Sequence, residues 1–167
     1  GAGKRVGGDT PKQFQEVAGR PVLVHTLAAF EACEAVDAIV LVGPEDRLET
    51  CAALSRQMGC RKVGAVVAGG AERQDSVRCG LSAVSDETRV VAIHDGARPL
   101  VDDEDITRVI EVALETGASV IGRPLTDTIK RVAGDRVEET LDRKDLWGVQ
   151  TPQAFELGLI CEAHERA

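Results

Sequence analysis

The stretch Ala38-Ile39-Val40-Leu41-Val42-Gly43-Pro44 decides the fold class. It is apolar at every position before the Gly-Pro pair, so neither face of the segment carries polar residues that would contact solvent. A short run of this kind is typical of a strand that is buried on both faces, as in a parallel sheet. Similar runs at 63–67, 90–93 and 118–122 alternate with stretches of helical periodicity. This alternation predicts an α/β fold of the Rossmann-like kind, with a mainly parallel sheet flanked by helices.

The stretches between these runs have the periodicity of amphipathic helices. Residues 21–30 begin with a proline and repeat apolar residues every three or four positions, which is typical of a helix with Pro in its first turn. Residues 102–116 show the same repeat and carry acids in the first turn, where they favour the helix dipole. We predict further helices over 45–57 and 72–81, and a last one from about Pro152 or Phe155 to the end.

The pattern changes between Pro124 and Gln150. Two short alternating stretches, 128–132 and 136–141, flank the sequence Ala133-Gly134-Asp135. Alternating stretches around a glycine-containing turn indicate a β-hairpin. We therefore predict a hairpin arm over about 124–150 that projects from the sheet.

Composition argues against two classes of partner. The net charge is −8, and the chain has three Phe, one Trp and no Tyr. A nucleic-acid surface needs a basic face, and single-strand binding also needs aromatic platforms, so we expect no nucleic-acid partner. A local basic pocket that binds a small phosphorylated ligand is compatible with the negative net charge of the chain. No apolar run approaches the roughly 18 residues of a membrane span, so we expect no membrane partner.

The cysteines indicate a reducing compartment. There are five, without a C-x-x-C pair or a zinc-like spacing: Cys33, Cys51, Cys60, Cys79 and Cys161. An odd number of scattered cysteines is typical of free thiols rather than a disulfide framework. We expect a protein of the reducing cytoplasm.

The first thirteen residues combine glycines with cations. Four glycines let the backbone N–H groups approach a ligand closely, and two of the three cations Lys4, Arg5 and Lys12 could meet the charge of a phosphate chain. The spacing matches neither a Walker loop nor the dinucleotide fingerprint. Taken alone, the stretch is either an anion cradle or a flexible terminus.

Three loops are expected to meet at one edge of the sheet. Residues 68–76 and 94–99 each follow a predicted strand, and residues 1–13 would follow a strand that is not in the sequence. Ligands of open α/β sheets bind beyond the carboxyl ends of the strands. This placement favours the anion cradle over the flexible terminus.

With these loops taken together, the chain resembles the 2-C-methyl-D-erythritol 4-phosphate (MEP) cytidylyltransferase family of the non-mevalonate isoprenoid pathway. The glycine loop and Pro-Lys also occur in many sugar-nucleotide pyrophosphorylases, whereas the later motifs narrow the choice. The motifs that carry the resemblance span the whole chain: Gly1-x-Gly3-x-Arg5-x-Gly7 with Pro11-Lys12-Gln13, Gly69–Val77, His94–Pro99, Thr126–Lys130, Asp142-Arg143 with Leu146-Trp147, and Thr151-Pro152-Gln153.

The resemblance implies that CTP and MEP react to give the CDP-alcohol and pyrophosphate, with Mg²⁺ or another divalent cation. It implies that Arg5 and Lys12 stabilise charge on the α-phosphate, and that Thr128 and Arg143 are the other two catalytic residues. The implied CTP-binding residues are Gly1, Ala2, Gly3, Lys12, Gly70, Ala71, Ser76, Asp95 and Gly96. Lys12 could alternatively be a solvated loop lysine, and Asp75 could simply brace its loop.

The resemblance also implies a second substrate site and a homodimer. The implied substrate-binding residues are Asp95, Arg98, Thr128 and Arg143. Asp95 is also the candidate metal ligand, although the cation would be held mainly by the CTP phosphates. The arm would carry Thr128 and Arg143 into the site of the neighbouring subunit. For Arg98 a structural salt bridge is the alternative, and His94 is better interpreted as a packing residue than as a catalyst.

The chain departs from the family pattern at both ends. In the family a strand precedes the glycine loop, and a later segment brings an Asp and a Lys to the site. We therefore expect residues 1–167 to form a single cytidylyltransferase domain without its first strand and C-terminal segment. The alternatives are a cytidylyltransferase for ribitol 5-phosphate or another polyol phosphate, and a CTP-binding half of a bifunctional enzyme. A dinucleotide-binding oxidoreductase is disfavoured by the glycine spacing.

Overall fold

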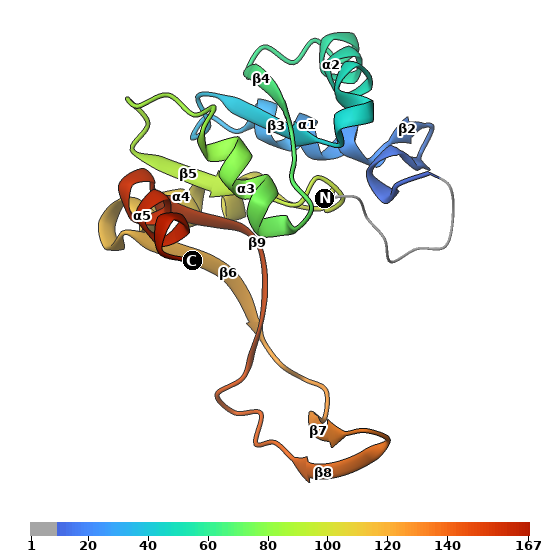
Figure 1. The fold of residues 1–167 in the computed structure, drawn as a ribbon, viewed down its shortest axis with the longest axis vertical. Helices are drawn as coiled ribbons and strands as arrows, with labels where there is room; N and C mark the ends of the chain where they lie inside the picture. Colours follow the sequence, from blue (N-terminus) through green and yellow to red (C-terminus); the bar gives the residue numbers. More distant parts are fainter. Residues whose placement is uncertain (1–9) are drawn as a thin grey trace.

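A computed structural model describes residues 10–167 of the chain. Strands and helices alternate in the body of the molecule, and a hairpin arm extends well away from it (Figure 1). The predicted α/β class is confirmed, since strands are present at all four apolar runs. Among the described residues no helix combines the length and the apolar character that crossing a membrane requires.

The strands form a parallel pair and a mixed three-stranded sheet. Strand β3 (Ile39–Gly43) pairs in parallel with β4 (Val63–Ala68). In the second sheet β9 (Trp147–Glu156) lies between β5 (Val90–Ile93) and β6 (Ala118–Pro124), and is antiparallel to both. The sheet is therefore less uniformly parallel than predicted, because β5 and β6 run the same way on either side of an opposed strand.

The last helix begins later than predicted, because residues 147–156 form the strand β9. We predicted a helix from about Pro152 or Phe155, but both residues lie in β9, and the helix α5 begins at Leu157 and ends at Arg166. Proline cannot donate to a ladder and is normally confined to edges and bulges. Here Pro152 lies where the pairing of β6 with β9 shifts register, between the pairs of Val120 and Gly122. The central strand therefore accommodates its proline at an irregularity.

Helices cover both faces of the sheets (Figure 1). The helices α1 (Val22–Ala32) and α4 (Asp103–Thr116) lie on one face, and α3 (Arg73–Leu81) and α5 lie on the other. Helix α4 begins with the Asp102 side chain accepting from the backbone N–H of Asp105 at 2.8 Å, and ends at Gly117, whose φ of 86° suits glycine. Helix α2 (Leu48–Gln57) follows the 3-10 turn η2 (Glu45–Arg47).

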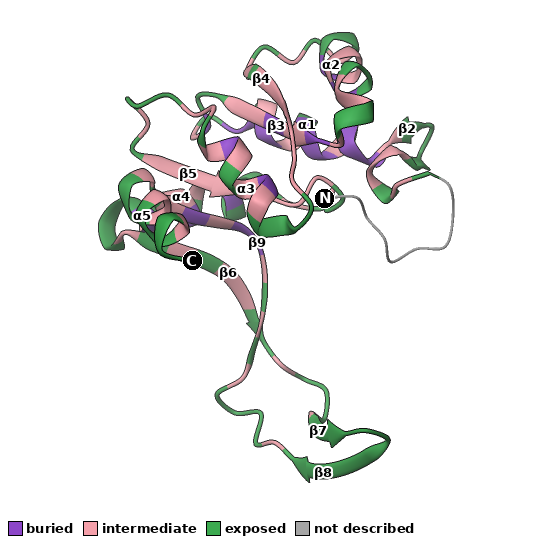
Figure 2. Ribbon diagram, in the orientation of Figure 1, coloured by how far each residue is buried: buried purple, intermediate pink, exposed green. Residues whose placement is uncertain are grey.

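The buried apolar residues gather in clusters in the body of the molecule, where helices pack on one another and on the strands (Figure 2). Near β3, Leu23 and Leu27 of α1 pack against Leu41 and Cys51. Under α4, Val109 and Ala113 pack against Ala154 of β9. The predicted amphipathic faces of α1 and α4 are therefore the ones that the core uses.

The segment before α1 contains a small hairpin that the sequence analysis did not predict. The 3-10 turn η1 (Lys12–Phe14) leads into β1 (Glu16–Val17) and β2 (Arg20–Pro21), which pair antiparallel. The connecting residues Ala18 and Gly19 have φ of 52° and 75°, the positive values that a type I′ turn needs. Ala-Gly is a weak turn signal, which is why the pattern was missed.

The projecting arm is confirmed as a hairpin. Strand β7 (Lys130–Ala133) pairs antiparallel with β8 (Arg136–Thr140), and Gly134 in the turn has a φ of 58°. Every residue of the two strands is exposed (Figure 2). The hairpin is held by its own ladder and by the ion pair of Arg131 with Glu139 at 2.7 Å, without a core of its own.

Glu31 ties the end of α1 to the loop that precedes β4. Its carboxylate accepts hydrogen bonds from the Cys60 thiol at 2.8 Å and from the backbone N–H groups of Arg61 and Lys62 at 2.9 and 3.0 Å. These three donors, the thiol first, lower the pKa of Glu31 to about 2. Burial, followed by the bond to Glu31, raises the pKa of Cys60 to about 11, so this thiol stays protonated and donates.

Glu31→Gln is expected to lower the free energy of unfolding at neutral pH, because an amide cannot accept all three bonds. A depressed carboxyl pKa stabilises the fold above the unfolded pKa, and that stabilisation is lost as the pH falls through the folded value. The difference between wild type and variant should therefore be full above about pH 4.5 and shrink toward pH 2. Urea unfolding at several pH values measures it, with the exposed Glu34→Gln as control. Equal stability of Glu31→Gln and wild type at pH 7 would contradict the assignment.

All five cysteines are free, as predicted. Cys33 and Cys51 are buried, and Cys60, Cys79 and Cys161 are half-buried. In the buried pair the thiols act as small apolar groups within the core.

Candidate functional site

Lys12 lies on a helical turn that is anchored to the core. The backbone N–H of Phe14 donates to the Pro11 carbonyl at 2.9 Å, which closes the turn. The Phe14 ring packs against the cluster around Leu23 and Leu27, while the Lys12 side chain is exposed. The turn thus fixes the Lys12 backbone and leaves its ammonium group to solvent or a ligand.

The loop between β4 and α3 is packed tightly against the first turn of that helix. A Cβ atom at Gly70 would lie 2.2 Å from Cβ of Asp75, so no other residue fits there without displacing the loop. Asp75 accepts from the backbone N–H of Glu72 at 3.1 Å, and therefore braces the loop, as one of our two interpretations held. The Ser76 hydroxyl is buried and donates to the Glu72 carbonyl at 3.1 Å. Ala71, in the same loop, is exposed.

Asp95 is held between two arginines at the end of β5. Its Oδ1 accepts from Nε of Arg73 at 3.2 Å, and its Oδ2 accepts from Nε of Arg98 at 3.0 Å. Arg73 also donates to the side-chain oxygen of Gln153 on β9 at 3.1 Å. Burial disfavours the charged form of Asp95, but the hydrogen bonds from Arg98 and Arg73 outweigh it and hold the pKa of the carboxyl below its ordinary value. Asp95 is therefore an ionised acceptor at neutral pH.

His94 is the middle of a hydrogen-bond chain under this ion cluster. The backbone N–H of Asp95 donates to the Thr151 hydroxyl at 3.3 Å, and the hydroxyl lies 3.1 Å from Nδ1 of His94. Nε2 of His94 is 3.0 Å from the Arg98 carbonyl, which can only accept. The chain is satisfied by a neutral imidazole that is protonated on Nε2.

His94 is accordingly a packing residue, as predicted. Burial lowers the pKa of His94, against the opposing effect of its bond to the Arg98 carbonyl. Its ring also packs on Phe30 of α1, with centroids 4.9 Å apart. Both ring nitrogens are occupied, so the side chain positions the 94–99 loop.

The same loop is fastened to α1 at Gly96. The Gly96 carbonyl accepts from the buried Thr26 hydroxyl at 3.1 Å. A Cβ atom at Gly96 would meet Leu23 at 3.2 Å, so the loop lies close against the helix. Since the Lys12 turn packs on α1 as well, one helix supports two of the three predicted loops.

Thr128 and Arg143 lie in the arm, between β6 and β7 and between β8 and β9. The hairpin β7–β8 extends away from β5 and α3 (Figure 1). Arg143 donates to the backbone carbonyl of Thr126 across the base of the arm, and both Thr128 and Arg143 are exposed.

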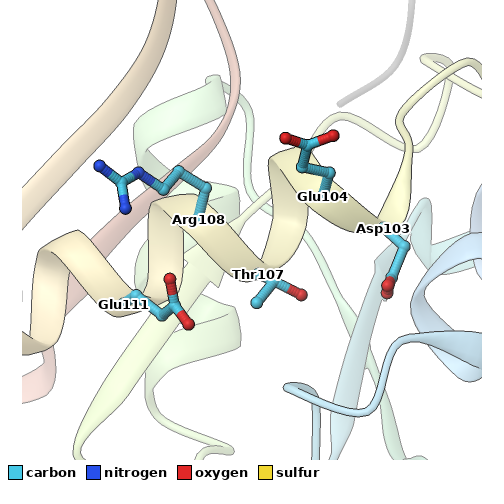
Figure 3. A pocket seen from close by; sticks show the side chains of 5 residues that line it. All are labelled: Asp103, Glu104, Thr107, Arg108 and Glu111. Atoms are coloured by element: carbon cyan, nitrogen blue, oxygen red, sulfur yellow. The ribbon is translucent and has the colours of Figure 1, made fainter.

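Two surface hollows are lined by other residues. Figure 3 shows one along the outer face of α4, and its side chains include none of the residues predicted to bind CTP or the second substrate. It is lined by Asp103, Glu104, Thr107, Arg108 and Glu111. A second lies near the contact of α3 with the C-terminal helix, lined by Glu72, Gln74, Asp75, Arg78, His164 and Ala167.

The described part of the chain thus brings Asp95, Gly96 and Arg98 together, and the turn that carries Lys12 packs on the same supporting helix. Gly1, Ala2, Gly3 and Arg5 lie outside the described residues. Arg73, Gln153 and Thr151 complete the cluster around Asp95, and no role was predicted for them from the sequence. The signal that could have found them is their position in two of the quoted motifs, 69–77 and 151–153.

A metal site is not formed by the described residues alone. Among residues 10–167, no group of three or more His, Cys, Asp or Glu side chains is placed to hold an ion. Both carboxylate oxygens of Asp95, the candidate ligand, already accept from guanidinium groups. Each carboxylate oxygen has a second lone pair, so a cation at Asp95 would share the carboxylate with the two arginines.

The family model described as "IspD: 2-C-methyl-D-erythritol 4-phosphate cytidylyltransferase" matches residues 1–167. The chain belongs to this family. The family identified from the motifs is therefore confirmed, and with it the class of nucleotidyltransferases.

Similar curated proteins cover the whole chain. The MEP cytidylyltransferase of Halalkalibacterium halodurans is 47% identical over 167 residues, which is 100% of this chain and 73% of the relative. That of Bacillus velezensis is 46% identical over 167 residues, or 72% of its length.

Solved structures of the family share the fold. The 4-diphosphocytidyl-2C-methyl-D-erythritol synthase of Anaerococcus prevotii has a TM-score of 0.81 and 29% identity, over 90% of this chain and 66% of that one. The MEP cytidylyltransferase of Thermus thermophilus has a TM-score of 0.74 and 35% identity, over 93% of this chain and 70% of that one.

Proposed function

We propose that this chain transfers the cytidylyl group of CTP to MEP, giving 4-diphosphocytidyl-2-C-methyl-D-erythritol and pyrophosphate. The observation that carries the proposal is the match of the MEP cytidylyltransferase family to residues 1–167. The cluster of Asp95, Arg98 and Arg73 supports it, because a cationic, partly buried loop end suits a phosphorylated substrate.

The reaction asks the protein for positioning and charge neutralisation. An oxygen of the MEP phosphate attacks the α-phosphorus of CTP and forms the new P–O bond. The bond from the α-phosphorus to the bridging oxygen breaks, and pyrophosphate leaves with that electron pair. The attacking phosphate is already an anion, so no general base is required.

Lys12 and Arg5 are assigned to the α-phosphate. A fixed ammonium group stabilises charge that grows in the transition state more effectively than mobile water does. The structure supports this for Lys12 through the anchored turn and the exposed side chain. Gly1, Ala2 and Gly3 are assigned to the triphosphate, and Gly70, Ala71 and Ser76 to the nucleoside, with Ser76 supporting the loop from within.

Asp95 and Arg98 are assigned to the second substrate, with Asp95 and Gly96 also bordering the nucleotide. The Arg98 side chain is 47% exposed and can turn its guanidinium group toward a phosphate. Arg98 does form the ion pair with Asp95 that was the structural alternative to substrate binding. The pair is compatible with binding because it uses only Nε of Arg98.

We further propose a homodimer in which the arm completes the partner's site. Thr128 and Arg143 flank the hairpin of the arm, which extends away from the body of the molecule, and this placement supports action on another copy (Figure 1). The arm and its root also expose large apolar side chains that a partner would cover: Val132, Val137, Trp147 and Val149.

A divalent cation remains a prediction. Because the described residues do not fit a metal on their own, a cation would be held mainly by the CTP phosphates, a mode that Mg²⁺ commonly uses. No step above is assigned to it. The cytoplasm, or the plastid stroma in a plant, likewise remains the predicted compartment.

The test is pyrophosphate release by the full-length protein with CTP, Mg²⁺ and each polyol phosphate in turn. We expect turnover with MEP. Turnover with ribitol 5-phosphate but not with MEP would overturn the proposed substrate. CTP binding without any pyrophosphate release would instead support a nucleotide-binding module.

A further inference from the structure

Arg73 connects the start of α3 with the loop after β5 and with strand β9, three segments that are far apart in the sequence. It is the first residue of α3, directly after the 68–72 loop. Its Nε reaches Asp95 after β5 at 3.2 Å, and its Nη2 reaches Gln153 on β9 at 3.1 Å. A planar guanidinium group that donates in two directions fixes the relative position of both acceptors.

The two arginines share Asp95 without competing for the same oxygen. Arg73 uses Oδ1 and Arg98 uses Oδ2. A carboxylate and a guanidinium group otherwise prefer a bidentate pair with two parallel hydrogen bonds. The contact with Arg73 therefore holds the Asp95 carboxylate in an orientation in which Arg98 contacts only Oδ2.

This arrangement leaves most of the Arg98 donors unused. Arg98 binds Asp95 through Nε, and within residues 10–167 its two terminal nitrogens have no hydrogen-bond partner. Those two nitrogens carry the paired N–H groups that suit two oxygens of a phosphate. The Arg98 backbone is also fixed, because its carbonyl accepts from His94 at 3.0 Å.

We propose that Arg73 is a positioning residue for the second substrate: it holds Asp95 so that Arg98 offers its terminal nitrogens to the phosphate of the incoming polyol phosphate. The inference rests on the proposed function, since it assigns Arg98 to that phosphate. Arg73 directly follows the 68–72 loop, which is assigned to the nucleoside, and it thus links that loop to the binding of the second substrate.

The expected consequence of removing Arg73 follows from the competition for Asp95. In Arg73→Ala the Oδ1 atom loses its partner, and Asp95 can rotate to take Arg98 as a bidentate pair. Arg98 then has to break an ion pair before it binds the substrate. The cost falls mainly on the polyol phosphate. Asp95 also borders the nucleotide, so CTP binding weakens by a smaller factor, because the glycine loops that hold CTP do not depend on Arg98.

The experiment is steady-state kinetics of the full-length protein with each substrate varied. For Arg73→Ala we expect KM for MEP to rise about tenfold, and KM for CTP to change by less than about twofold. The matched control is Arg78→Ala, which removes an exposed Arg–Asp ion pair from the same helix and should leave both constants unchanged. Equal increases in both KM values, or the same behaviour as Arg78→Ala, would overturn the proposal.

A double mutant separates positioning from a general loss of structure. Because Arg73 acts through Arg98, adding Arg73→Ala to Arg98→Ala should raise KM for MEP by no more than about twofold further. Independent, multiplicative effects would refute the coupling. If Arg73→Ala does not fold, Arg73→Lys carries the test, since it keeps the charge but not the planar fork, and its KM for MEP should still rise.

The two proposals can fail separately. A wild-type protein that releases no pyrophosphate from CTP and MEP would end the proposed function before any variant is compared. Wild-type turnover with Arg73→Ala kinetics like those of Arg78→Ala would leave the function intact and remove only the role of Arg73.

Discussion

Lys12→Ala is expected to lower kcat by roughly 100-fold or more, which is typical for the loss of a charge contact made in the transition state. The exchange removes the ammonium group that we assign to the α-phosphate and touches nothing in the core. Lys12 is exposed, and the turn that carries it is closed by backbone groups and by the packing of Phe14. Pyrophosphate release at saturating CTP and MEP measures the effect.

The control for Lys12 lies at the end of the same turn. Gln15→Ala removes an exposed side chain whose amide reaches the Thr10 carbonyl at 3.3 Å, and it should keep kcat near the wild-type value. We expect Arg5→Ala to behave like Lys12→Ala. Near-normal kcat in Lys12→Ala would show that Lys12 is a solvated loop lysine after all.

Mixing two inactive proteins, Lys12→Ala and Arg143→Ala, is expected to restore activity. If the arm works in trans, a heterodimer has one site with both residues intact. With random exchange of subunits about a quarter of all sites are intact, so recovery should approach about a quarter of wild-type activity. Exchange is allowed to reach equilibrium before pyrophosphate release is followed.

The matched control mixes two variants of the arm, Thr128→Ala and Arg143→Ala. Every composite site in that mixture receives one damaged arm, so no recovery is expected. Absence of recovery in the Lys12 and Arg143 mixture, despite measured subunit exchange, would exclude the composite site. Activity of dilute, monomeric wild-type protein would exclude it as well.

Prediction from the sequence succeeded for elements whose hydrophobic pattern depends on burial alone. The run at 38–44 has no polar position, and it became β3 because both of its faces are covered by helices. The face of α4 that carries Ile106, Val109 and Ala113 was predicted for the same reason. The arm was predictable because its alternating residues surround a glycine turn.

The errors have physical causes of another kind. Thr151-Pro152 looked like the start of a helix, since proline is common there and rare in central strands. Whether a strand can carry a proline depends on the register of its neighbours, and residues 147–156 alone do not contain that information.

For the site, the sequence identified Asp95 and Arg98 but not what holds them. Arg73 and Gln153 reach Asp95 from other elements, at positions that only the packing of α3 and β9 against β5 determines. The division of the two carboxylate oxygens between two arginines is likewise a result of three-dimensional placement, which spacing along the chain cannot show.

The position of β9 has a consequence for how the molecule is made. Val90 pairs with Glu156 and Ala118 pairs with Phe155, so the strand that joins β5 to β6 is synthesised after both of them and after the whole arm. Until then a nascent chain on the ribosome carries two unsatisfied strand edges, which are templates for pairing with other chains. Contacts between residues so far apart in the chain also form slowly. Residues 124–156 therefore have to emerge before the three-stranded sheet can close.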